Sequence, residues 1–172
     1  ENLLKEINYY FGKVWALSPK HQETLSEWAK SYFVAEDYLK MKEKAEECIA
    51  LNPNIDSCYW YLGLSEILLG NEKKGQEYLE MAKEKRFPYD TRTSYSQLAI
   101  VYTKTKNYKE LIFVYNSLIL IDPQNIQYRA TLAFVYKELG DYKKAREEAL
   151  KILEIAPEVK DDVNLFLQTL PY

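Results

Sequence analysis

Apolar residues recur along the chain at spacings of three and four residues, the period of one face of an α-helix. Proline interrupts this pattern at nearly regular distances. Pro19, Pro53, Pro88, Pro123 and Pro157 lie 34, 35, 35 and 34 residues apart. A fixed period of this size predicts an array of stacked helical repeats, because one such repeat cannot bury its apolar face alone.

Five columns of side chains repeat with the prolines. They are Trp28, Leu62, Leu98 and Leu132; Ala29, Gly63, Ala99 and Ala133; Tyr32, Glu66, Tyr102 and Tyr136; Asp37, Asn71, Asn107 and Asp141; and Ala45, Leu79, Tyr115 and Ala149. The small second column lets two helices approach closely. The Asp/Asn column marks helix starts, because these short side chains accept hydrogen bonds from free backbone amides. Each period therefore reads as helix, turn, helix and proline loop.

A tight turn, which favours Gly, precedes the Asp/Asn column. The residues at this turn are Glu36, Gly70, Lys106 and Gly140. These features resemble the tetratricopeptide repeat family, and the best copy spans residues 126–159. In that copy the positions that fit the motif are Leu132, Ala133, Tyr136, Gly140, Tyr142, Ala145 and Pro157. Met41, Leu111 and Lys106 depart from the motif in the first and third copies. The resemblance implies an all-α, right-handed α-solenoid of helix-turn-helix repeats.

The chain is expected to form a single array of about ten helices. Residues 1–19 read as a half repeat, the second helix of an earlier copy, and residues 160–172 as a capping helix with a polar outer face. The predicted full repeats are 22–55, 56–91, 92–125 and 126–159. The third repeat starts late because residues 87–91 hold an insertion.

Composition narrows the range of functions. The chain has 172 residues with sixteen Tyr, five Gly and one His, and a net charge of −3. The acidic balance argues against nucleic acid, and so against the RNA-binding pentatricopeptide repeats that share a similar period. His21 reads as a solvated loop residue, and no phosphate-binding motif or general acid/base pair occurs. We therefore expect no enzyme activity, no cofactor and no metal site.

The two cysteines belong to neighbouring repeats. Cys48 falls on an inward column of a second helix, and Cys58 begins the next helix. They are expected to lie close together, as buried free thiols rather than as a disulfide.

The family resemblance implies that the first helix of each repeat lines a concave groove where a protein or peptide binds. The positions in this sequence are Lys30, Phe33, Trp60, Tyr61, Leu64, Gln97, Ile100, Thr131 and Phe134. Trp60 and Tyr61 are expected to be partly exposed, whereas Leu64 could line the groove or pack between repeats. Co-chaperone members hold a C-terminal carboxylate in this groove with Lys, Asn and Arg. Only Lys30 matches that clamp, so a chaperone tail is not the expected partner.

Two further surfaces are unusual. Phe113 and Leu120 are apolar where other copies place mainly charged residues, which indicates either a second contact surface or packing against the insertion around Phe87. The helix expected over residues 2–17 is predicted to expose apolar side chains, and two copies are expected to associate there.

An alternative origin is a multi-span membrane protein. The chain looks like the repeat tails of bacterial O-antigen ligases or polymerases, and its low Arg content (four residues) favours a bacterial source. In this alternative the chain is a soluble segment tethered through upstream sequence. The chain itself has no apolar run long enough to span a membrane.

Overall fold

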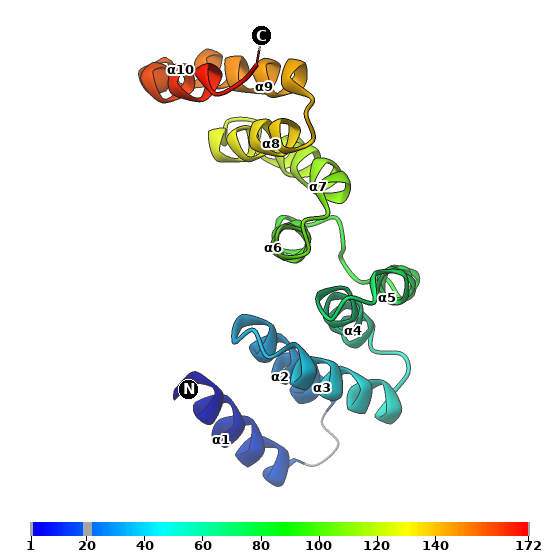
Figure 1. Ribbon diagram of the computed structural model, residues 1–172. Coiled ribbons are helices and arrows are strands. Elements are labelled where there is room, and N and C mark those ends of the chain that lie inside the picture. The colour runs from blue at the N-terminus through cyan, green and yellow to red at the C-terminus, as the bar shows by residue number, and fades with distance from the viewer. Residues whose placement is uncertain (1, 19–21, 172) are drawn as a thin grey trace. The chain divides into compact units, whose positions relative to one another are not determined.

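The computed structural model describes residues 2–18 and 22–171, so the predicted roles of Pro19 and His21 lie outside the described residues. The described residues contain ten α-helices and one short 3₁₀ helix, with no strand (Figure 1). The helices are α1 (Asn2–Leu17), α2 (Gln22–Val34), α3 (Tyr38–Leu51), α4 (Asp56–Leu68), α5 (Glu72–Glu84), α6 (Arg92–Lys104), α7 (Tyr108–Ile121), α8 (Ile126–Glu138), α9 (Tyr142–Ile155), η1 (Pro157–Val159) and α10 (Lys160–Gln168). The predicted all-α fold is confirmed, and each predicted full repeat contains two α-helices.

The predicted cap column acts as expected in three of the four copies. The side chains of Asp37, Asn107 and Asp141 each accept a hydrogen bond, 3.2 Å long, from the backbone amide three residues further on. Asn71 makes no such cap, because its side-chain amide donates to the Glu66 carboxylate at 2.8 Å. In this copy the residue at the cap position therefore binds a buried carboxylate instead of capping its helix.

The turn before each cap is left-handed whether or not it holds glycine. The φ angles are +91° at Gly70, +75° at Gly140, +59° at Glu36 and +55° at Lys106. Two L-residues accept a conformation that costs them roughly 1 kcal/mol relative to glycine. The predicted turn column is thus confirmed, and the departure at Lys106 leaves the turn unchanged.

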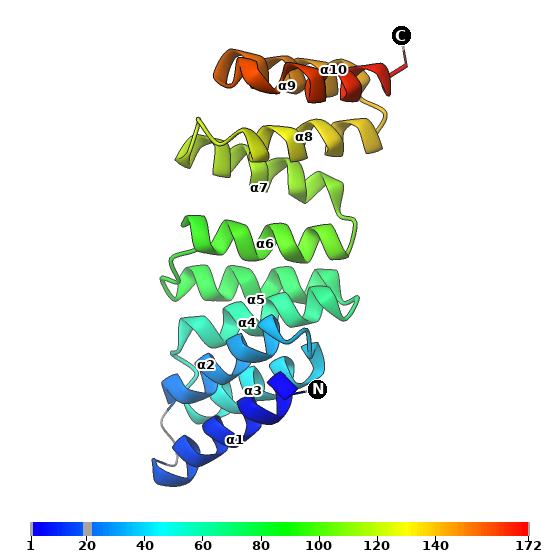
Figure 2. The same ribbon diagram turned by 90° about the vertical axis from the view of Figure 1, so that its left-hand side faces the viewer.

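The helices group into two compact units, Glu1–Tyr89 and Asp90–Tyr172, called unit 1 and unit 2 below. Unit 1 holds α1 to α5, and unit 2 holds α6 to α10. Within each unit the two helices of a repeat pack side by side, as α4 and α5 do in Figure 2.

The closest helix approach in unit 1 joins α4 to α5 through Gly63 and Gly75. A Cβ added at Gly63 would lie 2.8 Å from the Leu79 side chain, and one added at Gly75 would lie 2.7 Å from the carbonyl oxygen of Gly63. Both distances are too short for real contacts. The small-residue column is therefore required here by the packing of the two helices.

A buried ion cluster also joins the helices of unit 1. Glu66 replaces the tyrosine of its column and is fully buried. The Nζ atoms of Lys42 on α3 and Lys74 on α5 lie 3.1 and 2.9 Å from its Oε1. Burial alone would raise the pKa of Glu66, but hydrogen bonds from Lys74, Asn71 and Lys42 outweigh it and hold this pKa below its ordinary value.

The expectation of free thiols is wrong. Cys48 on α3 and Cys58 on α4 are joined by a disulfide, with the Cα atoms 6.1 Å apart. Both side chains are fully buried. Their proximity was predicted from the repeat pattern, but the bond depends on how α3 and α4 approach each other across the repeat boundary.

The core of unit 2 ends in a cluster under the capping helix. Ala133, Ala149, Ile152 and Val163 form its buried centre. Around it pack the partly buried side chains of Ile126, Leu153, Val159, Phe166 and Leu167. Val163, Phe166 and Leu167 of the capping helix α10 thus contribute to this core.

Candidate functional site

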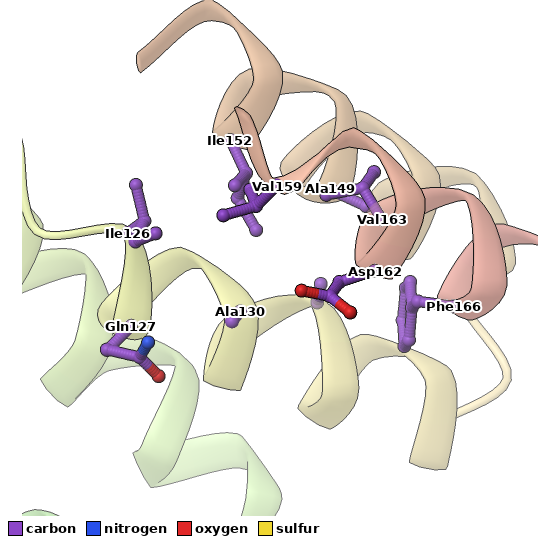
Figure 3. Close-up of a pocket in the computed structure, with 10 residues that line it drawn as sticks. Ile126, Gln127, Ala130, Ala149, Ile152, Val159, Asp162, Val163 and Phe166 are labelled. Carbon is purple, nitrogen blue, oxygen red and sulfur yellow. The ribbon is translucent and has the colours of Figure 1, made fainter. Parts of the chain in front are cut away.

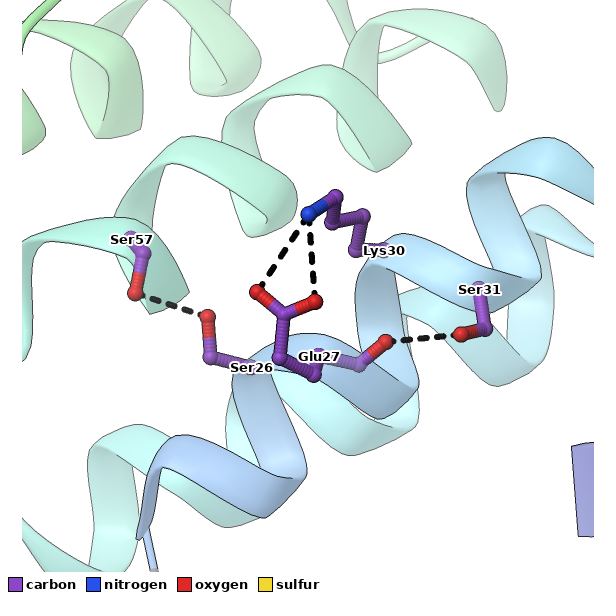
Figure 4. Close-up of polar contacts among 5 residues, drawn as sticks. All are labelled: Ser26, Glu27, Lys30, Ser31 and Ser57. Atoms are coloured by element: carbon purple, nitrogen blue, oxygen red, sulfur yellow. Dashed lines mark hydrogen bonds and ion pairs between the residues drawn. The ribbon is translucent and has the colours of Figure 1, made fainter. Parts of the chain in front are cut away.

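The face of unit 1 that was predicted to form a groove is closed. Helices α2 and α4 pack directly against each other. The Oγ atoms of Ser26 and Ser57 form a hydrogen bond of 2.7 Å between them (Figure 4). Leu64 is fully buried and Phe33 is buried, so both pack between repeats.

The predicted exposure of Trp60 and Tyr61 is wrong, because their exposed fractions are only 2% and 6%. The reason lies in the insertion. Phe87 stacks on the Trp60 ring, with the ring centroids 4.5 Å apart and the planes 18° from parallel. The insertion that delays the third repeat therefore covers the aromatic side chain expected to bind a partner.

Lys30 remains at the surface of unit 1, but it has a partner. Its Nζ lies 3.1 Å from Glu27 Oε2 on the preceding turn of α2 (Figure 4). The hydrogen bond from Lys30 to Glu27 raises the pKa of the lysine, so it stays cationic. Neutralised by Glu27, Lys30 offers little net charge to an anionic partner.

Unit 2 presents a hollow between its first helices, called the α6–α8 hollow. Helices α6 and α8 do not pack directly against each other, and they lie apart in Figures 1 and 2. The hollow has a volume of about 550 Å³. Its lining consists of Ser96, Ala99, Ile100, Thr103, Lys104, Tyr115, Leu118, Gln127, Tyr128 and Thr131.

The chemistry of this hollow is mixed. Ile100 on α6 is 46% exposed, whereas Phe134 on α8, although 49% exposed, does not line the hollow. Tyr115 and Tyr128 lie with ring centroids 6.3 Å apart. Burial raises the pKa of the Tyr115 hydroxyl, so it stays protonated and is able to donate as well as accept. The α6–α8 hollow is therefore able to form both apolar contacts and hydrogen bonds.

A second, smaller cavity lies at the end of unit 2 and is called the terminal cavity. It has a volume of about 210 Å³ and lies between α8, α9 and α10 (Figure 3). Its lining consists of Ile126, Gln127, Ala130, Ala133, Ala149, Ile152, Val159, Asp162, Val163 and Phe166. Gln127 lines both this cavity and the α6–α8 hollow, so the two adjoin.

The structure brings together only part of the predicted site. Ile100 and Thr131 line the α6–α8 hollow, and Gln97 is half-buried on α6. Two residues that line these spaces were not predicted as site residues: Tyr115, on the second helix of its repeat, and Asp162, on the capping helix. One signal was present, because Tyr115 stands in a column where two other copies have alanine.

The convex apolar patch, Phe113 and Leu120 on α7, is exposed. Leu120 is 83% exposed, and Phe113 is 58% exposed with an edge contact to Tyr95, at 6.2 Å between ring centroids. The insertion residue Phe87 stacks on Trp60 instead. Helix α1 likewise exposes apolar side chains, as predicted: Leu3, Tyr9, Tyr10, Val14 and Leu17.

Other kinds of site find little support in the described part of the chain. No three acidic, His or Cys side chains among the described residues gather as a metal site would require. Among the helices described, none combines the length and the apolarity needed to cross a membrane.

Comparison with known proteins supports the repeat assignment. The model of the tetratricopeptide repeat family matches residues 93–125 and 126–159. MamA (residues 41 to the end) from Desulfovibrio magneticus RS-1 shares the fold, with a TM-score of 0.65 and 19% identity over 88% of this chain and 84% of that one. YrrB, described as a TPR protein with an unusual peptide-binding site, has a TM-score of 0.62 and 18% identity over 98% of this chain and 84% of that one. The two matched repeats and the shared fold support the tetratricopeptide repeat family for this chain.

Proposed function

We propose that this chain is a non-catalytic protein-interaction module that binds a peptide segment in the α6–α8 hollow. Tetratricopeptide repeats and the similar solved structures support a protein-interaction scaffold in general. The hollow is the observation that carries the finer proposal, because it exposes apolar and hydrogen-bonding groups together. YrrB, a protein of similar fold, is described as having a peptide-binding site.

The lining of the hollow suits a peptide backbone and an apolar side chain better than the charged end of a chain. Its hydroxyl and amide groups are able to pair with a peptide backbone, and Ile100 offers an apolar contact for a side chain. On the closed face of unit 1, the apolar residues expected in a groove, Phe33, Trp60 and Leu64, are buried. The groove positions expected on unit 1, Trp60 and Tyr61 among them, therefore contribute to packing in this proposal rather than to binding.

Selection from a random peptide library displayed on phage tests this proposal. We expect enrichment on the wild-type chain and a loss of at least tenfold in affinity for Ile100→Arg, which places a long cation in the hollow. Leu150→Arg on α9 is the matched control, since Leu150 has the same exposed fraction, 46%, and does not line the hollow. Peptides that bind both variants equally well would refute binding in the hollow.

Two accessory surfaces remain proposals. The convex apolar patch is proposed as a second contact surface, and Phe113→Glu tests it. If stability, oligomeric state and partner binding are all unchanged in this variant, the patch is no contact surface. Association of two copies through α1 is tested by sedimentation, where a strict monomer at high concentration would contradict it.

A second candidate function is the tail of a bacterial cell-surface glycan ligase or polymerase. None of the solved structures named above is described as such an enzyme. The observation in its favour is the Cys48–Cys58 disulfide, because disulfides persist in oxidising compartments such as the bacterial periplasm. Fractionation of the full-length native protein tests this candidate: recovery of a small protein outside the membrane fraction would remove it.

A further inference from the structure

The terminal cavity is a site that the repeat pattern does not require. In unit 1 the space next to Gly63 is filled by Leu79, whose side chain would lie 2.8 Å from a Cβ added there. In unit 2 the corresponding pair is Ala133 and Ala149, and both line the terminal cavity. Because Ala149 ends at its Cβ, part of the space that a leucine fills in the second repeat stays open in the last one, although the Cβ of Ala133 takes up some of it.

The cavity has the size and character of a pocket for one apolar side chain. Apart from Asp162 and Gln127, its lining side chains are all apolar, and most of them are aliphatic. An apolar cavity of about 150 Å³ is large enough to take up benzene. At about 210 Å³, this one accommodates the side chain of Leu, Met or Phe.

The rim of the cavity is acidic on the side of α10. Figure 3 shows the Asp162 carboxylate at the cavity, across from Ala130 of α8. Asp162 and its neighbours Glu158 and Asp161 are exposed, and Lys160 is the only cation between them in the sequence. A partner with a cation beside its apolar side chain therefore matches this rim in charge.

We propose that the terminal cavity receives an apolar side chain of the bound peptide while Asp162 pairs with a lysine or arginine next to it. This inference rests on the proposed peptide binding and specifies the partner. The Gln127 carboxamide adjoins both spaces, so a segment in the α6–α8 hollow continues into the terminal cavity. The preferred partner then carries an apolar–basic pair of residues at the end that reaches α10.

A peptide array with a fixed Gly/Ser frame tests this proposal. The central two residues run through all pairs, and the whole chain is the probe. We expect the strongest binding where Leu, Met or Phe neighbours Lys or Arg. Asp162→Lys should reverse the charge preference towards Asp or Glu, with roughly a tenfold change in relative binding.

Ala149→Leu in an Ala133→Gly background is the second variant, because it copies the Gly63–Leu79 pair and fills the cavity without adding a charge. It should remove the preference for a large apolar side chain by roughly tenfold, while circular dichroism shows an intact fold. Asn164→Lys on the same helix is the control for Asp162→Lys, since Asn164 does not line the cavity. The charge preference should survive this control.

The outcomes separate this inference from the proposed function. If Asp162→Lys and the combined Ala133→Gly and Ala149→Leu variant leave both preferences unchanged while Ile100→Arg abolishes binding, the terminal cavity is not part of the site and the α6–α8 hollow is. If binding is unaffected by Ile100→Arg as well, both proposals fail. A preference for acidic neighbours on the wild-type chain would also overturn the role of Asp162.

Discussion

The same repeat columns produce a closed surface in unit 1 and an open one in unit 2. In unit 1, α2 and α4 pack together and Ser26 bonds to Ser57 across them. In unit 2, α6 and α8 leave a hollow of about 550 Å³. The family motif fixes which residues face inward, but the size of a few side chains and one insertion decide whether the space between first helices is filled.

The units also differ in how their repeats are joined. A disulfide and the Glu66 ion cluster connect the first two repeats of unit 1. In unit 2 the corresponding connection includes the Tyr115–Tyr128 contact, with the ring centroids 6.3 Å apart. Unit 1 is thus cross-linked and closed, while unit 2 keeps open space for a partner.

Removing the disulfide should have the largest effect on the difference in stability between the two units. We expect Cys48→Ala combined with Cys58→Ala to lower the free energy of unfolding of unit 1 by about 3 kcal/mol, because a short loop regains its freedom in the unfolded chain. All three tryptophans lie in unit 1, so tryptophan fluorescence during urea unfolding reports on this unit. The tyrosine signal of unit 2 should change little.

Reductant provides the control for the cysteine variant. It should destabilise the wild-type chain by a similar amount and leave the double variant unaffected. Two reactive thiols in the unfolded, unreduced wild-type chain would contradict the disulfide.

The Glu66 cluster gives the next effect, and it depends on pH. We expect Glu66→Gln to lower the free energy of unfolding of unit 1 by about 2 kcal/mol at pH 7, because it removes charge-assisted hydrogen bonds from a buried site. The pKa of Glu66 is lower in the folded than in the unfolded chain. The ionised carboxylate therefore stabilises the fold above the ordinary glutamate pKa, about 4.3, and this contribution is lost as the pH falls through the folded pKa.

Urea titrations at pH 7 and pH 3 measure this difference. The gap between wild type and Glu66→Gln should shrink at pH 3, and a gap independent of pH would contradict the argument. Glu80→Gln is the control on α5, since Glu80 is exposed in its pair with Lys83. It should change the free energy of unfolding by at most about 0.5 kcal/mol.

The variant with the smallest expected effect gives unit 2 a side-chain pair that unit 1 has. Ala149→Leu in an Ala133→Gly background copies the Gly63–Leu79 pair into the last repeat. Relative to Ala133→Gly alone, it should raise the free energy of unfolding of unit 2 by about 1 kcal/mol, because it fills an apolar cavity. Slower hydrogen exchange of the α9 amides would measure this gain. A loss of stability would instead show that the cavity walls leave no room for the added side chain.

Local sequence predicted the helices, their turns and most of their caps. Capping by Asp37 and the left-handed turn at Gly70 depend on groups within a few residues, so a single sequence specifies them. Asn71 shows the limit of this reasoning, because a distant charge cluster captures its side chain. The convex apolar patch was also visible in the sequence, since only the third copy is apolar at both positions, Phe113 and Leu120.

The candidate site could be predicted only in outline. Ile100 and Thr131 were expected in the groove and line the hollow, but Trp60 was expected to bind and is buried. The ring of Phe87 stacks on Trp60 and causes that burial, and no local pattern around Trp60 predicts this contact.

The sequence by itself therefore determined the repeat, the helix order and the faces that turn inward, since these follow from helix periodicity and from neighbouring residues. The tertiary structure alone decided where space remains. Closure of unit 1 needs Phe87 to reach Trp60 and Ser26 to reach Ser57, and the terminal cavity exists because Ala149 lies opposite Ala133. Open space in a protein depends on side chains that meet from distant parts of the chain, and these meet only once the helices are packed.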